Sequence, residues 1–333
     1  MRASLSSGPG SLSKFCALTD QDRDIIAGPV VALIGPTAVG KTSLSLTICH
    51  ECNAEIVSVD SMQVYRYMDI GTAKATPAER AQVPHHLIDI VDPDQDYHAA
   101  SFVQDCLAAI ADIHQRGAVA LLTGGTGLYL QALKYGLFEA PAVDGEIRTG
   151  LKQRLGEEGS TTLHQELHQC DPATAERLHP HDGVRIIRAL EVFETTGRPM
   201  SEHIREQARR CGDRFLNFIT IGLTCPRNQL YKRINKRSRH MVESGLEAEV
   251  RGLLAMGYKA ELKSMQSIGY RHMMNYINGA WSQAEMLELL ARDTRRYAKR
   301  QCTWFNRDQS IRWFEPGQRE MIMSSIRSFL KRA

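Results

Sequence analysis

The amino-acid sequence predicts an α/β fold with a P-loop parallel-sheet core and a helical insertion domain. Apolar runs typical of buried strands, near 30–34, 56–59, 87–91, 118–122 and 216–223, alternate with helical patterns near 41–50, 101–115 and 126–135. Such alternation is typical of a parallel sheet. A Gly-rich loop follows the first apolar run directly, which predicts a phosphate-binding core. Between 140 and 212 the pattern is helical and polar, and this stretch predicts the insertion.

The chain of 333 residues is longer than a usual single domain, which favours a main domain with an inserted one. We predict a disordered extension over 1–27, a first core segment over 28–139, the helical insertion over 140–212 and a second core segment over 213–333. Helices near 226–257 and 283–305 and a short strand at 311–314 are expected in the second core segment. Residues 1–27 lack the Arg-rich, acid-poor character of a transit peptide.

The Gly-rich loop has the spacing of a phosphate-binding loop. Its backbone N–H groups and the start of the next helix can bind phosphate, Lys41 can reach the outer phosphate, and the Thr42 hydroxyl can ligate Mg²⁺. Strand, spacing, Lys-Thr pair and helix agree, which favours this interpretation over a simple turn. ATP binding is indicated by the motif only, because the loop alone does not identify the phosphate donor. The loop comprises Gly35, Pro36, Thr37, Ala38, Val39, Gly40, Lys41 and Thr42.

Two further strand ends carry polar residues. Asp60 follows the strand at 56–59, and Thr126 lies in a Thr-Gly-Gly-Thr-Gly run after the strand at 118–122. Because the carboxyl ends of strands line the ligand crevice of an open sheet, both residues should lie beside the phosphate loop. Asp60 can serve as a general base or a ligand of Mg²⁺-bound water, or only as the cap of a turn. The alternative for the second run is a helix N-cap with glycines for tight packing.

Cysteine and histidine patterns do not predict a metal centre. The eight cysteines are scattered, which favours free thiols in a reducing cytosol. Cys49 and Cys52 lie at i and i+3 on a helix without a second pair, so we interpret them as core thiols rather than zinc ligands. His164 and His168 are expected to be exposed helix residues, and His85-His86 a structural polar lining. No run of 18 apolar residues occurs, which excludes a spanning helix.

Positive charge gathers in the C-terminal portion of the chain. Residues 1–140 hold 9 Lys/Arg against 15 Asp/Glu, and the rest hold 32 against 23. Basic clusters lie at 231–240 and at 292–300, the latter just before Trp304-Phe305. Cations beside aromatic side chains suit an RNA loop, where phosphates are bound and bases stack. Solvated helix faces are the alternative.

The ordered motifs closely resemble those of the tRNA dimethylallyltransferases, or tRNA isopentenyltransferases. The resemblance covers about 28–314, with departures at Ala75, where many members have Pro, and in the first 27 residues. It implies transfer of a dimethylallyl group from dimethylallyl diphosphate to the exocyclic amine of the adenosine 3′ of the anticodon in tRNA. A Mg²⁺-dependent cytoplasmic monomer is expected. The matching motifs are GPTAVGKT (35–42), DSMQVYRYMDIGTAK (60–74), VPHHLID (83–89), GGTGLYL (124–130), VRIIRALEVFETTG (184–197), SIGYR (267–271) and AKRQCTWF (298–305).

The expected chemistry assigns roles to seven residues. Lys41, Mg²⁺ held through Thr42, and Arg237 would stabilise the leaving diphosphate, Arg237 being the residue that matches the family's arginine. Asp60 would accept the proton of the adenine amine. The adenine must be flipped out of the stacked loop, and Thr126, with Ser61 and Gln63, would hold it.

The resemblance also implies tRNA contacts in several segments, including the tRNA-binding C-terminal helices. The implied residues are Asp60, Ser61, Met62, Gln63, Thr126, Arg148, Val184, Arg185, Ile186, Ile187, Arg188, Gln266, Ser267, Ile268, Gly269, Tyr270, Arg271, Lys299, Arg300, Gln301, Cys302, Thr303, Trp304, Phe305, Asn306 and Arg307. Two other functions remain open from the sequence: an isopentenyltransferase acting on free adenine nucleotide, and a P-loop small-molecule kinase or RNA-binding ATPase. The helical insertion and basic second half count against a small acceptor.

Overall fold

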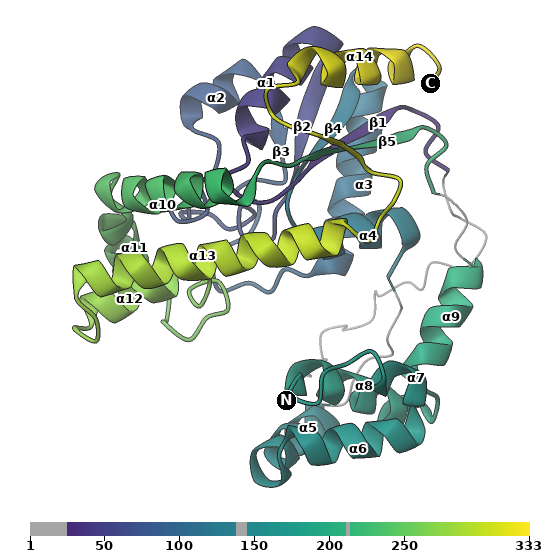
Figure 1. The fold of residues 1–333 in the computed structure, drawn as a ribbon, viewed down its shortest axis with the longest axis vertical. Coiled ribbons are helices and arrows are strands. Elements are labelled where there is room, and N and C mark those ends of the chain that lie inside the picture. Colours follow the sequence, from purple (N-terminus) through teal and green to yellow (C-terminus); the bar gives the residue numbers. More distant parts are fainter. Residues whose placement is uncertain (1–24, 138–144, 211–213) are drawn as a thin grey trace, which may run out of the picture.

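A computed structural model describes residues 25–137, 145–210 and 214–333, and its centre is a six-stranded parallel sheet (Figure 1). The strand order is β3-β2-β4-β1-β5-β6. The strands are β1 (Val30–Ile34), β2 (Ala54–Val59), β3 (His85–His86), β4 (Val119–Gly124), β5 (Phe218–Leu223) and β6 (Arg312–Phe314). The predicted α/β fold with a parallel sheet is confirmed.

Helices cover both faces of the sheet. α3 (Ala99–Gln115) and α4 (Gly127–Tyr135) pack on one face, whereas α1 (Lys41–Cys52), α10 (Arg227–Glu243) and α14 (Arg319–Leu330) pack on the other. In β1, Val30 and Ala32 belong to the first core and Val31 and Leu33 to the second. Strands buried on both faces need continuous apolar runs, which explains why these strands could be recognised from the sequence.

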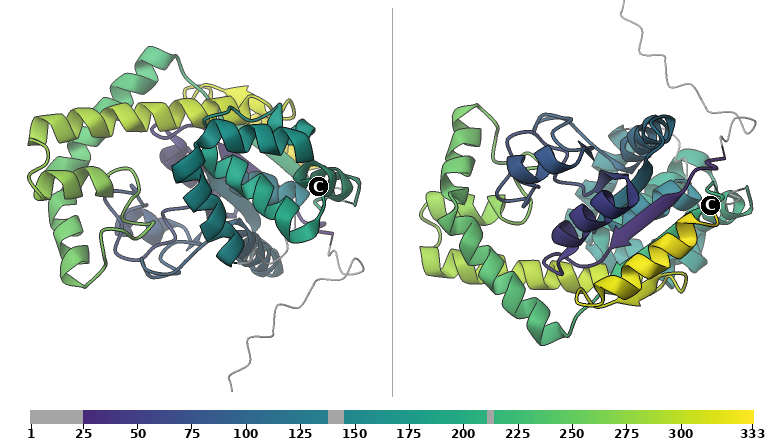
Figure 2. Two further views of the ribbon diagram at one scale, coloured as in Figure 1. Left: turned by 90° about the horizontal axis from the view of Figure 1, so that it is seen from below. Right: turned by 90° about the horizontal axis from the view of Figure 1, so that it is seen from above.

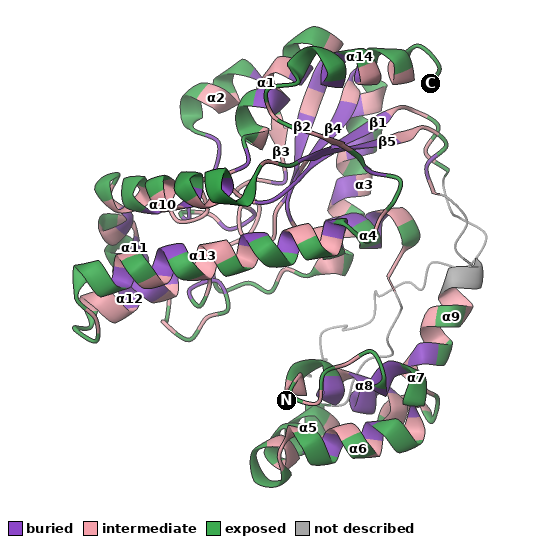
Figure 3. Ribbon diagram, in the orientation of Figure 1, coloured by how far each residue is buried: buried purple, intermediate pink, exposed green. Residues whose placement is uncertain are grey.

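A third core lies beside the sheet. It joins α11 (Leu246–Ala255), α12 (Tyr270–Ile277) and the start of α13 (Gln283–Phe305) to the segment that follows β2, before α2 (Pro77–Gln82). The long helix α13 also reaches both cores of the sheet, through Ala298 on one side and Phe305 on the other. Views from below and from above both show α13 running beside the sheet (Figure 2). Buried and exposed stretches alternate along α13 (Figure 3).

The helices of residues 145–210 form a separate bundle, which lies below the sheet in Figure 1. They are α5 (Gly145–Glu158), α6 (Ser160–Cys170), α7 (Pro172–Ala175), α8 (Gly183–Thr196) and α9 (Met200–Arg210). The bundle has its own core, including Leu151, Leu163, Leu167 and Leu190. The predicted boundaries after 139 and after 212, and residues 1–24 of the predicted extension, lie outside the described residues, so the domain limits stay a prediction.

Some local predictions were wrong. Only His85–His86 pairs with β2, because Leu87 and Asp89 have φ of 61° and 57° and turn the chain away from the predicted strand at 87–91. The predicted helix at 226–257 is broken at Gly245, whose φ is 101°. His164 is half-buried, and its Nε2 lies 3.0 Å from the Ala175 carbonyl oxygen, whereas His168 is exposed as expected.

Within the described ranges, the helices lack the combination of length and apolarity that crossing a membrane requires. The six cysteines placed there are free thiols. Cys49 is buried and Cys52 half-buried on α1, and burial raises the pKa of both thiols.

Candidate active site

The phosphate loop connects β1 to α1 and depends on two glycines. Gly40 precedes α1 with a φ of 112°, which side chains disfavour. A Cβ on Gly35 would lie 2.6 Å from the Leu223 carbonyl oxygen of β5. Glycine at these positions lets the loop fold tightly over the end of β1, so that α1 starts at Lys41.

The side chain of Lys41 folds back onto the start of the phosphate loop. Its Nζ donates hydrogen bonds to the carbonyl oxygens of Gly35 (2.9 Å) and Pro36 (3.0 Å). Burial, reinforced by the positive charge of Arg237, lowers the pKa of Lys41 to about 8. An incoming diphosphate would therefore meet an ammonium group that is held in place and poorly hydrated, which strengthens electrostatic binding.

Helix α10 brings two arginines to the loop. Arg237 donates from Nη1 to Thr37 Oγ1 at 3.2 Å, and Arg233 donates from Nη1 to the Val39 carbonyl oxygen at 2.9 Å. Burial lowers the pKa of Arg237, although the Asp60 carboxylate opposes this. The spacing of one helical turn thus places both guanidinium groups at the loop, as the sequence predicts for Arg237.

Asp60 follows β2 and faces the same cations. Its Oδ1 accepts the backbone N–H groups of Met62 (2.8 Å) and Gln63 (3.3 Å), so Asp60 does cap the turn that follows it. Its negative charge also acts on Lys41 and on Arg237. Asp60 therefore caps the turn and also places a carboxylate beside Lys41 and Arg237, where a general base is predicted.

The segment after β4 packs against the same turn. Thr126 Oγ1 accepts the backbone N–H of Ser61 at 3.2 Å. Two of the residues that are predicted to hold the flipped adenine are therefore in contact. A Cβ on Gly124 would collide with the Val59 carbonyl oxygen, and one on Gly127 with the Trp304 ring. The glycines thus serve tight packing. Thr126 precedes α4, but its side chain does not cap the helix.

Gln301 of α13 bridges the two loops. Its Oε1 accepts the Thr37 backbone N–H at 2.9 Å, and its Nε2 donates to the Gly125 carbonyl oxygen at 2.9 Å. The residue is 6 % exposed. Sequence reasoning assigned Gln301 to tRNA contact and missed this brace, because no local pattern shows that a helix so distant in the sequence meets the phosphate loop.

A cavity of about 460 Å³ joins these elements. It contains oxygen donors of the kind that Mg²⁺ prefers: the hydroxyls of Thr42 and Thr123 and the carboxylate of Asp60. Thr123 Oγ1 is buried without a hydrogen-bond partner among the described residues. Groups of three or more His, Cys, Asp or Glu side chains suited to a metal ion do not occur in the described ranges. The donor set fits an ion bound mainly by phosphate and water. The lining includes Thr37, Gly40, Lys41, Asp60, Gln63, Thr72, Ala73, Ala75, His85, Ile88, Gly125, Arg233, Arg237, Tyr297 and Gln301.

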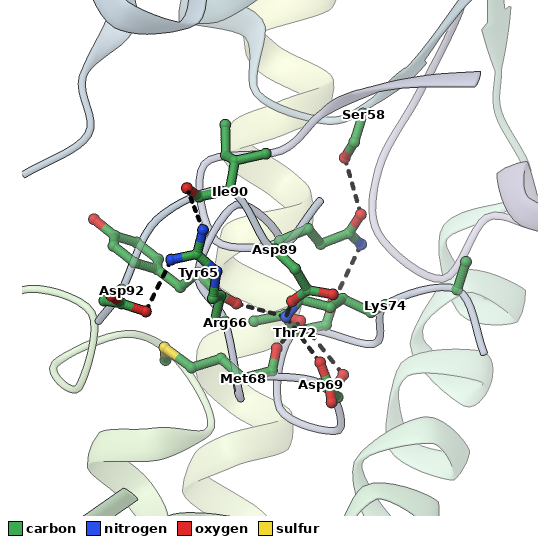
Figure 4. Close-up of polar contacts among 12 residues, drawn as sticks. Ser58, Tyr65, Arg66, Met68, Asp69, Thr72, Lys74, Asp89, Ile90 and Asp92 are labelled. Carbon is green, nitrogen blue, oxygen red and sulfur yellow. Dashed lines mark hydrogen bonds and ion pairs between the residues drawn. The ribbon is translucent and has the colours of Figure 1, made fainter. Parts of the chain in front are cut away.

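The cavity wall after Asp60 is held by a buried lysine (Figure 4). Lys74 has a side chain that is 1 % exposed, and its Nζ contacts Asp69 Oδ1 (2.8 Å), Asp89 Oδ1 (2.5 Å) and the Tyr65 carbonyl oxygen (2.5 Å). Glu249 of α11 accepts the backbone N–H groups of 69–71. These charges fix a wall that has little regular secondary structure. The local sequence does not reveal these ion pairs and hydrogen bonds, because the partner residues lie far away in the sequence.

The residues assigned to tRNA contact differ in exposure. Five have buried side chains, so any part they play in RNA binding is through their neighbours: Ile186, Ile187, Tyr270, Gln301 and Phe305. Half-buried residues include Met62, Ser267, Ile268, Arg271, Cys302 and Trp304. The exposed ones are Arg148, Val184, Arg185, Gln266, Lys299, Arg300, Thr303, Asn306 and Arg307.

In the bundle, a buried carboxylate joins two of the assigned arginines. Glu191 is fully buried, and its oxygens lie 3.1 Å from Arg148 Nε and 2.9 Å from Arg188 Nη1. Arg148 comes from α5 and Arg188 from α8, so the carboxylate brings guanidinium groups of two helices to one place.

Comparisons with known proteins identify the family of this chain. The family model described as IPP transferase matches residues 63–308. A protein of Desulfotalea psychrophila named tRNA dimethylallyltransferase is 52% identical over 306 residues, which are 92% of this chain and 97% of the relative. A protein of the same name from Geobacter metallireducens is 48% identical, over 90% of this chain and 97% of the relative.

Solved structures are similar as well. A tRNA isopentenylpyrophosphate transferase from Bacillus halodurans is 39% identical, with a TM-score of 0.66, over 91% of this chain and 97% of that one. A eukaryotic dimethylallyltransferase acting on tRNA is 28% identical, with a TM-score of 0.74, over 90% and 79% of the two chains.

Proposed function

The chain belongs to the IPP transferase family, and on this premise we propose that it attaches a dimethylallyl group to tRNA. The donor is dimethylallyl diphosphate. The acceptor is the exocyclic amine of the adenosine 3′ of the anticodon, and the product is N6-dimethylallyladenosine. The observation that carries this assignment is one cavity with the phosphate loop, Lys41 and Arg237 beside the Asp60 carboxylate.

The reaction forms a bond from the adenine nitrogen to the first carbon of the donor and breaks the bond from that carbon to diphosphate. Negative charge grows on the departing group, and the loop amides, Lys41 and Arg237 are placed to stabilise it. The nitrogen loses one proton as the bond forms. Asp60 would accept it, because this carboxylate follows the neighbouring strand and lines the same cavity.

Mg²⁺ would be held through the Thr42 hydroxyl together with the diphosphate, and when bound it would neutralise charge on the leaving group. Thr123 and Asp60 offer further oxygen atoms in the same cavity. The residues present therefore suit a magnesium ion that is shared with the substrate.

Acceptor recognition would use the turn after β2 and the segment after β4. The backbone N–H of Ser61 bonds Thr126 and that of Gln63 bonds Asp60, so we expect these residues to hold a flipped adenine beside Asp60. We further propose that the enzyme acts as a monomer in the cytoplasm, the compartment of its tRNA substrate. A kinase or a transferase for free adenine nucleotide is not favoured, since the relatives are named for tRNA modification.

The direct test incubates purified protein with labelled dimethylallyl diphosphate, Mg²⁺ and unmodified tRNA in the absence of ATP. Label should enter tRNA, and nucleoside digestion should recover it on adenosine. A tRNA with guanosine at the acceptor position, which lacks the 6-amino group, is the matched control and should stay unlabelled. A strict requirement for ATP would contradict the proposal and favour the kinase class.

A further inference from the structure

A cluster of arginines lies around one carboxylate at the junction of α12 and α13. Asp293 of α13 bonds Arg271 Nη2 at 2.7 Å and Arg292 Nε at 3.1 Å, and Arg296 Nη1 lies 3.6 Å from it. The Asp293 side chain is 15 % exposed, whereas those of the three arginines are 41 %, 44 % and 64 % exposed. One half-buried anion thus holds three cations at the surface.

A buried histidine completes the base of this arginine cluster. His272, 1 % exposed, lies with Nε2 3.2 Å from Asp293 Oδ2 and accepts the Gly269 backbone N–H at Nδ1 (3.4 Å). Burial, reinforced by Arg271, lowers the pKa of His272, which disfavours a further positive charge on the ring. The four side chains of Arg271, Arg292, Arg296 and Asp293 therefore carry an excess of two positive charges.

The geometry leaves donors available. A guanidinium has five N–H donors, and a carboxylate can accept only about four hydrogen bonds, which Asp293 shares among several partners. In the part of the chain that the structure describes, Asp293 contacts one nitrogen of each arginine, which leaves other N–H groups of the three guanidiniums for a second anion. Arginine forks match the oxygens of a phosphate in this way.

The cluster continues an exposed stripe on α13. Arg292, Arg296, Lys299 and Thr303 have the spacing i, i+4, i+7 and i+11 of one helix face, and all four are exposed. They extend over about 16 Å at 1.5 Å per residue. The stripe leads from the arginine cluster to the segment at 299–307, so a bound RNA strand could follow both.

From these contacts we propose that Arg271, Arg292 and Arg296 form a binding site for a backbone phosphate of the RNA, with Asp293 as the residue that positions them. Arg292 and Arg296 belong to no family motif named above. The proposal rests on the proposed function, because tRNA is the RNA concerned. It extends the RNA footprint along α13 beyond the 299–307 segment.

The main test replaces two arginines and leaves the contact between α12 and α13 intact. In R292Q/R296Q, Arg271 and His272 still bind Asp293, so thermal stability should change little. The affinity for tRNA should fall, and the slope of log affinity against log salt should flatten by roughly 0.7–0.9 for each phosphate that the variant no longer binds. The KM for dimethylallyl diphosphate should stay at the wild-type value, because the phosphate loop is a separate site.

A matched control is R312Q/R327Q, which removes one arginine from β6 and one from α14; α14 lies at the top of Figure 1, away from the start of α13 at the lower left. Its salt slope should equal that of the wild type. An unchanged slope in R292Q/R296Q would overturn the proposal while leaving tRNA modification by the wild type intact. Failure of the wild-type protein to bind or modify tRNA would instead overturn the proposed function.

Asp293→Asn separates positioning from net charge. The substitution keeps the shape and removes one negative charge, so a cluster acting by net charge alone would bind tRNA more tightly. Positioned arginines predict the reverse, a weaker affinity for tRNA with an unchanged KM for the donor. Tighter binding would overturn the role of Asp293, and R292Q/R296Q still tests the site if this variant does not fold.

Discussion

The side chain of Gln301 accepts the backbone N–H of Thr37 at 2.9 Å, which ties the last long helix of the chain to the loop after its first strand. The same side chain donates to the Gly125 carbonyl oxygen. One amide thus sets the spacing between the phosphate loop and the segment that carries Thr126. Helix α13 is therefore connected to both loops through one side chain.

Gln301→Ala should loosen the phosphate loop. The half-buried N–H of Thr37 and the buried carbonyl of Gly125 would lose their partner, at a cost of roughly 1–3 kcal/mol each, so kcat/KM for the donor should fall by about 10-fold or more. Steady-state kinetics with dimethylallyl diphosphate as the varied substrate measures this. Gln283→Ala, at an exposed position of α13, is the control. An equal effect of both variants would rule out the brace.

Asp60→Asn should separate a role of Asp60 as the general base from a role in binding tRNA. The amide keeps the size and can still accept the two N–H bonds of the turn, but it cannot accept the amine proton. Single-turnover transfer should slow by about 100-fold or more, with little change in tRNA affinity. Asp112→Asn on the surface of α3 should behave like the wild type. A wild-type rate in Asp60→Asn would remove the base assignment.

The pKa of Lys41 predicts how donor binding depends on pH. Lys41 titrates at about pH 8 in the free protein, and a bound diphosphate raises that pKa. Below pH 8 the ammonium is already charged, and affinity should be flat once the last phosphate ionisation, with a pKa of about 6, is complete. Above pH 8 binding must take up a proton, so affinity should fall by up to about tenfold per pH unit.

Calorimetry of dimethylallyl diphosphate binding across this range, without tRNA, checks the expectation. Lys41→Arg is the matched control, because arginine stays protonated and its affinity should not change near pH 8. A wild-type affinity that stays constant well above pH 8 would contradict the assigned pKa.

Leu163→Ala tests whether the bundle of α5–α9 is a separate unit, as the predicted boundaries imply. Leu163 is fully buried in the bundle core, and such a truncation costs about 2–5 kcal/mol. The bundle should melt earlier and tRNA affinity should fall, while calorimetric donor affinity stays unchanged. Leu121→Ala in the sheet should instead weaken donor binding. Loss of donor binding in Leu163→Ala would show that the bundle and the sheet unfold together.

The fold could be predicted where burial leaves a pattern in the sequence. β1, β2, β4 and β5 are apolar runs because both faces of the sheet are covered, and the phosphate loop has fixed spacing. The run at 87–91 also has the pattern of a strand, yet it does not join the sheet, because Asp89 forms ion pairs with Lys74 and Arg80. Tertiary ion pairs override local strand propensity there, and no local signal reveals them.

The site was predictable to the same extent. Lys41 follows from a motif, Asp60 and Thr126 from two strand ends, and Arg237 from the resemblance to the family; the structure places all four around the phosphate loop and the turn after β2. Gln301 and Glu191 were missed in their structural roles because each depends on contacts between distant or separate elements. A buried polar residue in an otherwise amphipathic helix is the signal that could have marked both for attention.

Thr37 and Gln301 are in contact although 264 positions of the chain separate them. The phosphate loop is therefore synthesised well before the residue that braces it. At translation rates of 5–20 residues per second, the phosphate loop leaves the ribosome roughly 13–53 s before its brace is made. During that interval β1 and α1 can form, but the loop lacks the support of α13. We therefore expect a growing chain to bind a diphosphate weakly until α13 has been made and Gln301 can contact the loop.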